Sequence, residues 1–137
     1  MKSINLYIET SSTAFQKKER RCGYVLEYIK ENTPITREGF RTGKGTYNQE
    51  VLRTLTEALK RVREPCKICI YSRNQFVLCA IRDKMEIWAR EDFKEIKNRE
   101  DWGALWEVIQ EHEISVEVGK HAYSDWILRE MEEENGK

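Results

Sequence analysis

The sequence predicts an α/β domain built on a mixed sheet of five strands, with the element order βββαβα(α)αβα. Three observations support this prediction. Three stretches within residues 4–41 have the composition and alternation of strands, the apolar residues from Val51 onward follow the period of a helix, and residues 66–71 then form a short apolar strand. A strand, a helix and a strand over this length predict a right-handed βαβ unit, so an antiparallel beginning continues into parallel pairing. At 137 residues, we expect one domain, 1–137.

The first strand ends at a carboxylate. Apolar and polar residues alternate from Ile4 to Ile8, Glu9 follows, and the polar stretch 10–13 then ends the strand. A carboxylate at the carboxyl edge of a sheet is a common component of a metal or catalytic site. Taken alone, however, a glutamate at this position is more often a solvated strand-end residue, so Glu9 by itself identifies no site.

The next elements are a second strand at 22–29, a turn at 31–34 and a third strand at 35–41. The residues Val51, Leu52, Leu55, Ala58, Leu59 and Val62 then share one face of a helix. Thr46 or Asn48 caps this helix, and Pro65 lies beyond its end.

A second helix begins within 72–75, and the charged segment 83–99 reads as an irregular or short helical connection. A third amphipathic helix carries Trp102 and Trp106, whose spacing indicates core packing. Residues 114–118 alternate as the fifth strand, and Ser124 or Asp125 starts the last helix.

Charge is balanced overall but unevenly distributed. The first 63 residues hold 13 basic and 7 acidic side chains, and the remainder hold 11 and 17. This balance excludes strong, indiscriminate nucleic-acid binding but permits a local basic patch, for which Lys17, Lys18, Arg20 and Arg21 are the candidates. No apolar run approaches the roughly 20 residues of a membrane span, and no signal-peptide pattern opens the chain. We therefore expect a cytoplasmic location and no membrane partner.

Four cysteines occur, at positions 22, 66, 69 and 79. Cys66 and Cys69 have the C-x-x-C spacing, but they lie in a predicted strand, where positions three apart point to opposite faces. One tetrahedral metal could not easily bind both, so we expect reduced and mostly buried thiols.

Five short motifs occur in an order and spacing that identify a family. They are Tyr7-Ile-Glu9-Thr-Ser, Thr46-Tyr-Asn-Gln-Glu50-Val-Leu, Ile70-Tyr-Ser-Arg73-Asn-Gln75-Phe-Val, Lys97-Asn98 before Trp102, and Val118-Gly-Lys-His121-Ala. In these motifs, and over nearly its whole length, the chain resembles the type 1 ribonuclease H family. The resemblance implies a ribonuclease H-like fold, with the first strand central in the sheet and helices on both of its faces.

Enzymes of that family cleave the RNA strand of RNA–DNA hybrids with two divalent cations, Mg²⁺ or Mn²⁺, held by four carboxylates. By resemblance, Glu9 and Glu50 take the first two positions, although the family has Asp at the first. Arg73 stands where the third carboxylate is expected. The fourth is Asp125 or, with a different gap in a shortened loop, the position falls on Leu128 and no acid remains. The resemblance thus implies the metal ligands Glu9, Glu50 and Asp125, with Glu9, Glu50 and position 73 converging at one sheet edge. At that edge, the planar guanidinium of Arg73 either bridges Glu9 and Glu50 or turns outward to solvent.

The resemblance also assigns a catalytic role beside the cleaved phosphate to His121, the counterpart of a mobile-loop histidine. It assigns nucleic-acid contacts to Lys17, Lys18, Arg20, Arg21, Asn48 and Gln75. We expect a divergent ribonuclease H-like protein with weak or lost hydrolysis, because a cation replaces an anionic ligand. Two alternatives remain open: a non-enzymatic module that binds nucleic acid or a protein partner, and a working nuclease that uses one metal.

Overall fold

The structure, a computed structural model, describes residues 1–135. Its elements are β1 (Lys2–Thr10), β2 (Arg20–Lys30), β3 (Thr33–Gly43), α1 (Tyr47–Leu59), β4 (Cys66–Ser72), α2 (Gln75–Asp83), α3 (Met85–Arg90), α4 (Arg99–Ile109), β5 (Glu113–Val118) and α5 (Ser124–Asn135). The predicted element order is confirmed, and the charged connection 83–99 contains the short helix α3.

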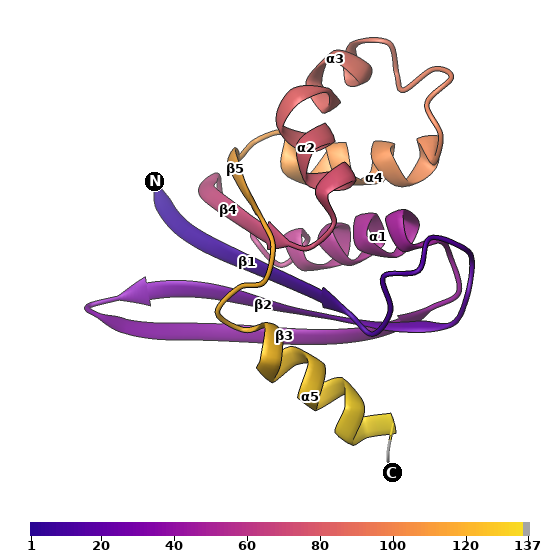
Figure 1. Ribbon diagram of the computed structural model, residues 1–137. Coiled ribbons are helices and arrows are strands. Elements are labelled where there is room, and N and C mark those ends of the chain that lie inside the picture. Colours follow the sequence, from indigo (N-terminus) through magenta and orange to yellow (C-terminus); the bar gives the residue numbers. More distant parts are fainter. Residues whose placement is uncertain (136–137) are drawn as a thin grey trace.

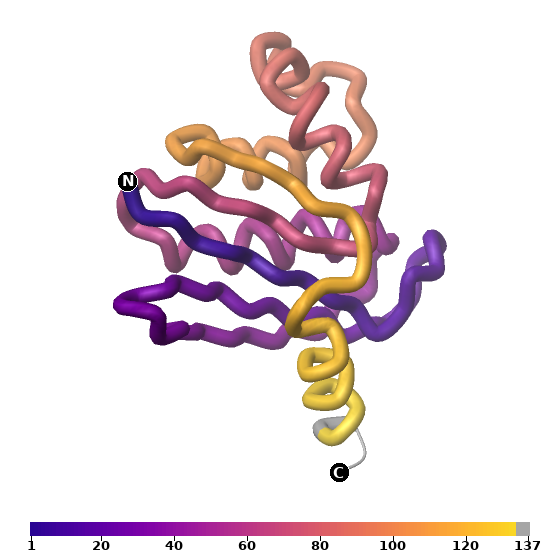
Figure 2. Tube along the Cα trace, turned by 60° about the vertical axis from the view of Figure 1, so that its left-hand side comes forward, coloured from indigo at the N-terminus to yellow at the C-terminus, as the bar shows by residue number. Residues whose placement is uncertain are grey.

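The five strands form one mixed sheet in the order β3-β2-β1-β4-β5, with β1 in the centre (Figure 2). The pairs β1–β2 and β2–β3 are antiparallel, whereas β1–β4 and β4–β5 are parallel. Helices α1 to α4 lie on one face of the sheet, and α5 packs against β1 and β2 on the other (Figure 1). The predicted fold class, a mixed five-stranded sheet with helices on both faces, is confirmed.

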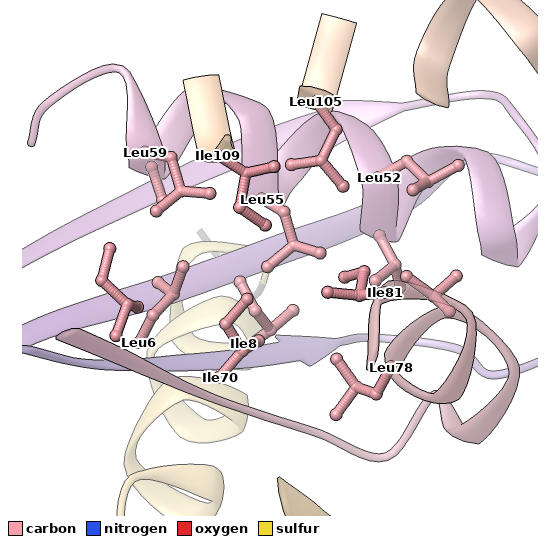
Figure 3. Close-up of a cluster of buried hydrophobic side chains, with 14 of the residues drawn as sticks. Leu6, Ile8, Leu52, Leu55, Leu59, Ile70, Leu78, Ile81, Leu105 and Ile109 are labelled. Atoms are coloured by element: carbon pink, nitrogen blue, oxygen red, sulfur yellow. The ribbon is translucent and has the colours of Figure 1, made fainter. Parts of the chain in front are cut away.

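The alternation in β1 separates the two faces of the sheet. Leu6 and Ile8 are buried under α1, in the main core, and Tyr7 joins a smaller core beneath α5. The main core brings together side chains from α1, α2, α4 and the strands (Figure 3): Leu6, Ile8, Leu52, Leu55, Leu59, Ile70, Leu78, Ile81, Leu105 and Ile109. Burial of each such side chain stabilises the fold by roughly 1.5–3 kcal/mol, and this packing fixes the position of α1 against β1.

The conformation of a turn and a helix cap explain where β3 and α1 begin. Glu31 and Asn32 have φ of 50° and 63°, the left-handed conformation that a two-residue hairpin turn requires. The third strand therefore begins at Thr33, two residues earlier than predicted, and includes Pro34, which is tolerated because β3 is an edge strand. At the start of α1, Thr46 is the cap, because its side chain accepts from the Gln49 backbone N–H.

The cysteines are free thiols. Cys22 and Cys66 are buried, and Cys69 and Cys79 are partly buried, in agreement with the prediction of reduced, mostly buried thiols. Across residues 1–135, no helix is long and apolar enough to cross a membrane.

Candidate functional site

The candidate site lies at the carboxyl end of β1, around the buried carboxylate of Glu9. Because β1 and β4 are parallel neighbours, their carboxyl ends meet at one edge of the sheet and bring Arg73 beside Glu9. The Arg73 Nε donates to both Glu9 oxygens, at 3.1 and 3.0 Å. From the first residue of α5, the Ser124 hydroxyl donates to Glu9 Oε2 at 2.5 Å. The predicted meeting of Glu9 and Arg73 is confirmed, and the Glu9 charge is balanced inside the protein.

His121 lies against the same cluster, with only 1% of its side chain exposed. Its Nδ1 accepts from the Tyr123 backbone N–H at 3.2 Å, and its Nε2 therefore carries the proton and donates to the Ile8 carbonyl at 2.8 Å. Burial lowers the pKa of His121 and outweighs the opposing effects of the Ile8 carbonyl and the Glu9 charge. The ring of His121, the counterpart of the family's histidine, packs against Tyr7 and Tyr71 and is buried in this structure.

Glu50 belongs to a different ion-pair network, and it is fully buried. Arg41 from β3 bonds its Oε1, while Arg53 and the Gly45 backbone N–H donate to its Oε2, each at 2.9 Å. Burial by itself raises the pKa of Glu50, but the hydrogen bonds from Arg41 and Gly45 and the charges of Arg41 and Arg53 together lower it. The carboxylate therefore anchors α1 to the edge strand β3.

The two glutamates lie on opposite faces of the sheet, so the predicted convergence of Glu9 and Glu50 is wrong. Glu9 pairs with Gly23, and a Cβ at Gly23 would meet Ile127 of α5, which places Glu9 on the α5 face. Glu50 is held by Arg41, which pairs with Cys22, the residue next to Gly23. Because neighbouring residues in a strand point to opposite faces, Arg41 and Glu50 lie on the α1 face. Arg73 consequently bonds Glu9 and does not bridge it to Glu50.

Asp125 does not reach Glu9 either. Its side chain is 73% exposed and forms an ion pair with Lys120 at 3.2 Å. Leu128, the alternative at this position, packs beside the small core under α5. One position earlier, Ser124 has its side chain turned inward, so the helix supplies a hydroxyl rather than a carboxylate to Glu9.

These residues do not fit the two-cation centre that the resemblance implies. In the part of the chain that the structure describes, no three His, Cys, Asp or Glu side chains gather as metal ligands. The predicted ligands Glu9, Glu50 and Asp125 are thus not brought together. The donor set at the edge of the sheet is one carboxylate that is already paired with a guanidinium, whereas two adjacent cations require several anionic oxygens.

A groove of about 920 Å³ opens beside Arg73. Its lining residues come from the β1–β2 loop, the amino-terminal end of α1, and α2 and α3. Among the lining side chains are Phe15, Tyr47, Gln75, Phe76 and Trp88. The residues Phe15 and Phe76 are 77% and 57% exposed, so this groove presents aromatic residues to solvent.

The predicted nucleic-acid contacts are distributed unequally around this groove. Gln75 lines the groove and is exposed, whereas Asn48 accepts a hydrogen bond from Asn74 Nδ2 at 2.9 Å. Lys17 and Lys18 are exposed on the β1–β2 loop, and Arg21 is half-buried at the start of β2.

Arg20 is not available for a phosphate contact, and that expectation is wrong. The residue is 1% exposed, and its guanidinium donates to the carbonyls of Ser12, Ala14 and Gln16 at 2.7–2.9 Å. A loop without strand pairing must satisfy its buried carbonyls in another way, and Arg20 does so.

Sequence reasoning missed the groove rings and the partners of Glu50. Phe15 is an isolated aromatic residue in a polar loop, and Phe76 lies outside the apolar face that Val77 and Ala80 define, so both carried a detectable signal. Arg53 follows Glu50 by three residues in a helix, a spacing typical of ion pairs. The role of Arg41 carried no local signal, because Arg41 lies in β3 whereas Glu50 lies in α1.

Comparison with known proteins gives a consistent result. The RNase H family model matches residues 1–122. A ribonuclease H from Sulfurovum sp. (strain NBC37-1) is 32% identical over 127 residues, which cover 92% of this chain and 78% of that protein. A ribonuclease HI from Helicobacter pylori (strain ATCC 700392 / 26695) is 38% identical over 91 residues, and the match covers 66% of this chain but only 61% of that protein.

Solved structures show the same fold at low identity. The crystal structure of LC9-RNase H1, described as a type 1 RNase H with the type 2 active-site motif, has a TM-score of 0.82 at 14% identity, covering 99% of this chain and 73% of that one. A foamy viral protease-reverse transcriptase in complex with RNA/DNA hybrid has a TM-score of 0.62 at 12% identity, and the match covers 85% of this chain and 17% of that one.

Proposed function

The chain belongs to the ribonuclease H family, and from this membership and the site geometry we propose that it binds nucleic acid, with RNA–DNA hybrid as the first candidate, while its hydrolysis of the RNA strand is weak or absent. One observation supports the loss of hydrolysis above all others: the Arg73 guanidinium is bonded to Glu9, the carboxylate at the end of the central strand. The fold and family support the relation to nucleases that act on RNA–DNA hybrids.

Electrostatics explains why this pairing opposes metal binding. Near a protein surface, two like unit charges about 4 Å apart repel by about 4 kcal/mol, and a divalent cation doubles that cost. Glu9 is one carboxylate, its charge is already balanced by Arg73, and Glu50 and Asp125 lie elsewhere. We therefore expect neither Mg²⁺ nor Mn²⁺ to be held at Glu9.

Binding, in contrast, does not need the metal centre. Lys17 and Lys18 are exposed on a loop that borders the aromatic groove, and no ion pair to either is found in the described chain. The hybrid complex of the foamy viral reverse transcriptase supports nucleic acid as a partner for this fold. Non-specific phosphate contacts of this kind depend strongly on salt.

The test combines a cleavage assay with a binding assay. We expect the protein to bind a labelled RNA–DNA hybrid in EDTA and to leave it intact when Mg²⁺ or Mn²⁺ is added, under conditions in which the Sulfurovum ribonuclease H cleaves it. Replacing Lys17 and Lys18 with Ala should reduce the slope of log K against log salt by roughly 1.8, or about 0.9 per phosphate. The matched control replaces the exposed Lys30 and Lys67 with Ala and should leave the slope unchanged.

Two results contradict this proposal. Cleavage at a rate comparable to that of the Sulfurovum enzyme shows that Glu9 and its partners support catalysis after all. Absence of binding even at low salt favours the alternative, a module that contacts a protein partner.

A further inference from the structure

We infer that Arg73 forms a metal-independent binding site for a nucleic-acid phosphodiester, so that a side chain supplies the positive charge that bound cations supply in the related nucleases. This inference rests on the proposed function and specifies how the groove holds a strand. It assigns Arg73 a role toward the ligand, in addition to its pairing with Glu9.

The geometry divides the guanidinium into two parts. The Nε contacts both oxygens of Glu9, and Glu9 is itself held by Ser124. Within residues 1–135, no hydrogen bond or ion pair engages the Nη1 and Nη2 of Arg73. The Arg73 side chain is 38% exposed and lines the groove. A planar fork whose inner nitrogen is anchored, and whose outer nitrogens are available, is suited to bind two oxygens of one phosphate.

The anchoring makes Arg73 a better phosphate ligand than a free surface arginine. An unconstrained arginine loses side-chain freedom when it binds, whereas Glu9 already restrains this one. The Glu9 carboxylate is 3% exposed and lies on the Nε side, away from the available edge. A phosphate at Nη1 and Nη2 would therefore be closer to the guanidinium than to the carboxylate.

The groove also offers surfaces for the bases that flank such a phosphate. Phe15 and Phe76 line it with largely exposed rings, from the β1–β2 loop and from α2. Stacking of a base on an aromatic side chain contributes about 1–3 kcal/mol in single-strand complexes. A phosphodiester beside Arg73 with a base on one of these rings accounts for both the unused nitrogens and the exposed rings.

The experiment measures the affinity of the full chain for fluorescein-labelled strands of about 12 nucleotides, in EDTA, by fluorescence anisotropy. The probes are single-stranded DNA, single-stranded RNA and an RNA–DNA hybrid. We expect Arg73→Gln to weaken binding about tenfold, because charge-assisted hydrogen bonds to a phosphate are lost. Arg73→Lys, which keeps the charge but lacks the fork, should weaken it less. Arg129→Gln removes the same charge from an exposed position on α5 and should leave the affinity unchanged.

Two further variants guard against misfolding. The double variant Glu9→Gln with Arg73→Gln leaves no unpaired buried charge and should bind as weakly as Arg73→Gln. Phe15→Ala alters an exposed loop ring and should weaken single-strand binding by about fivefold or more. If the variants lose affinity only for single strands, the ligand is an unpaired strand. If Arg73→Gln weakens hybrid binding equally and Phe15→Ala has no effect, the ligand is the duplex. Both results support the phosphodiester contact.

The outcomes separate the two proposals. If the unaltered protein binds and both Arg73→Gln and the double variant bind equally well, this inference alone is overturned. Binding that requires Mg²⁺ overturns it in the same way. Absence of binding by the unaltered protein overturns the proposed function and the inference together.

Discussion

The ion pair between Glu9 and Arg73 makes a quantitative prediction about stability. Removing one partner of a fully buried pair costs about 3–5 kcal/mol, because the other charge remains buried and unpaired. Glu9 has 3% of its side chain exposed, but Arg73 has 38%, so water screens the pair and the cost is lower. The Ser124 hydrogen bond also remains in an Arg73 variant. We therefore expect Arg73→Gln to lower the free energy of unfolding by about 2 kcal/mol.

The coupling between Glu9 and Arg73 is measured by urea and thermal unfolding in a double-mutant cycle. The cycle compares the unaltered protein, Glu9→Gln, Arg73→Gln and the double variant. For a domain of this size, 2 kcal/mol corresponds to a decrease of roughly 8 °C in Tm. Glu9→Gln combined with Arg73→Gln should restore part of the loss, giving a coupling energy of about 1–2 kcal/mol. Because no three metal-ligating side chains gather within residues 1–135, Mg²⁺ should not restore the stability of Arg73→Gln. Arg99→Gln, which removes an exposed pair with Asp92, is the matched control and should change little.

A coupling energy below about 0.5 kcal/mol would refute this reasoning, since that is the range of exposed pairs. Recovery of the Arg73→Gln variant by Mg²⁺ would also contradict it, because it would show that the edge retains enough anionic ligands to hold a cation.

Three further predictions concern other buried groups. Glu50→Gln should cost about 3 kcal/mol in urea unfolding near neutral pH, because Arg41 and Arg53 lose their shared anion. Because the pKa of Glu50 is lowered in the fold, its contribution to the free energy of unfolding is present above the ordinary pKa of 4.5 and is lost as pH falls through the folded pKa. The stability of Glu50→Gln should therefore depend less on pH than that of the unaltered protein between about pH 5 and pH 3. Gly43→Ala should unfold at a markedly lower urea concentration, because its Cβ would lie 1.8 Å from an oxygen of the fixed Glu50 carboxylate. The control is Gly103→Ala, whose Cβ would have no atom within 4 Å, and it should be neutral or stabilising. The pKa of His121 is also lowered, so the folded state opposes protonation of its ring, and the urea midpoint of the unaltered protein should fall as pH drops below 6.5. The fall should be smaller in His121→Asn, and an unchanged pH profile in that variant would show that the ring is not held neutral.

The sequence by itself determined the element order and one contact of the site. Alternation and helical period are local properties of the backbone, so they identify strands, helices and their apolar faces without knowledge of the fold. The meeting of Glu9 and Arg73 was also predictable, because the family resemblance implies the topology and the carboxyl ends of two adjacent parallel strands then lie together.

Only the tertiary structure decided where the remaining candidates point. Glu50 starts α1 as predicted, but the rotation of that helix against the sheet directs its carboxylate to Arg41 on the opposite face from Glu9. Arg20 is a basic loop residue in the sequence, yet the fold buries it among carbonyls. Ser124 rather than Asp125 faces inward, so a hydroxyl meets Glu9 while Asp125 pairs with Lys120 at the surface. Glu50 and Ser124 meet partners from other elements, and Arg20 meets carbonyls of the loop that folds back around it. A local pattern fixes which residues share a face but not what that face meets.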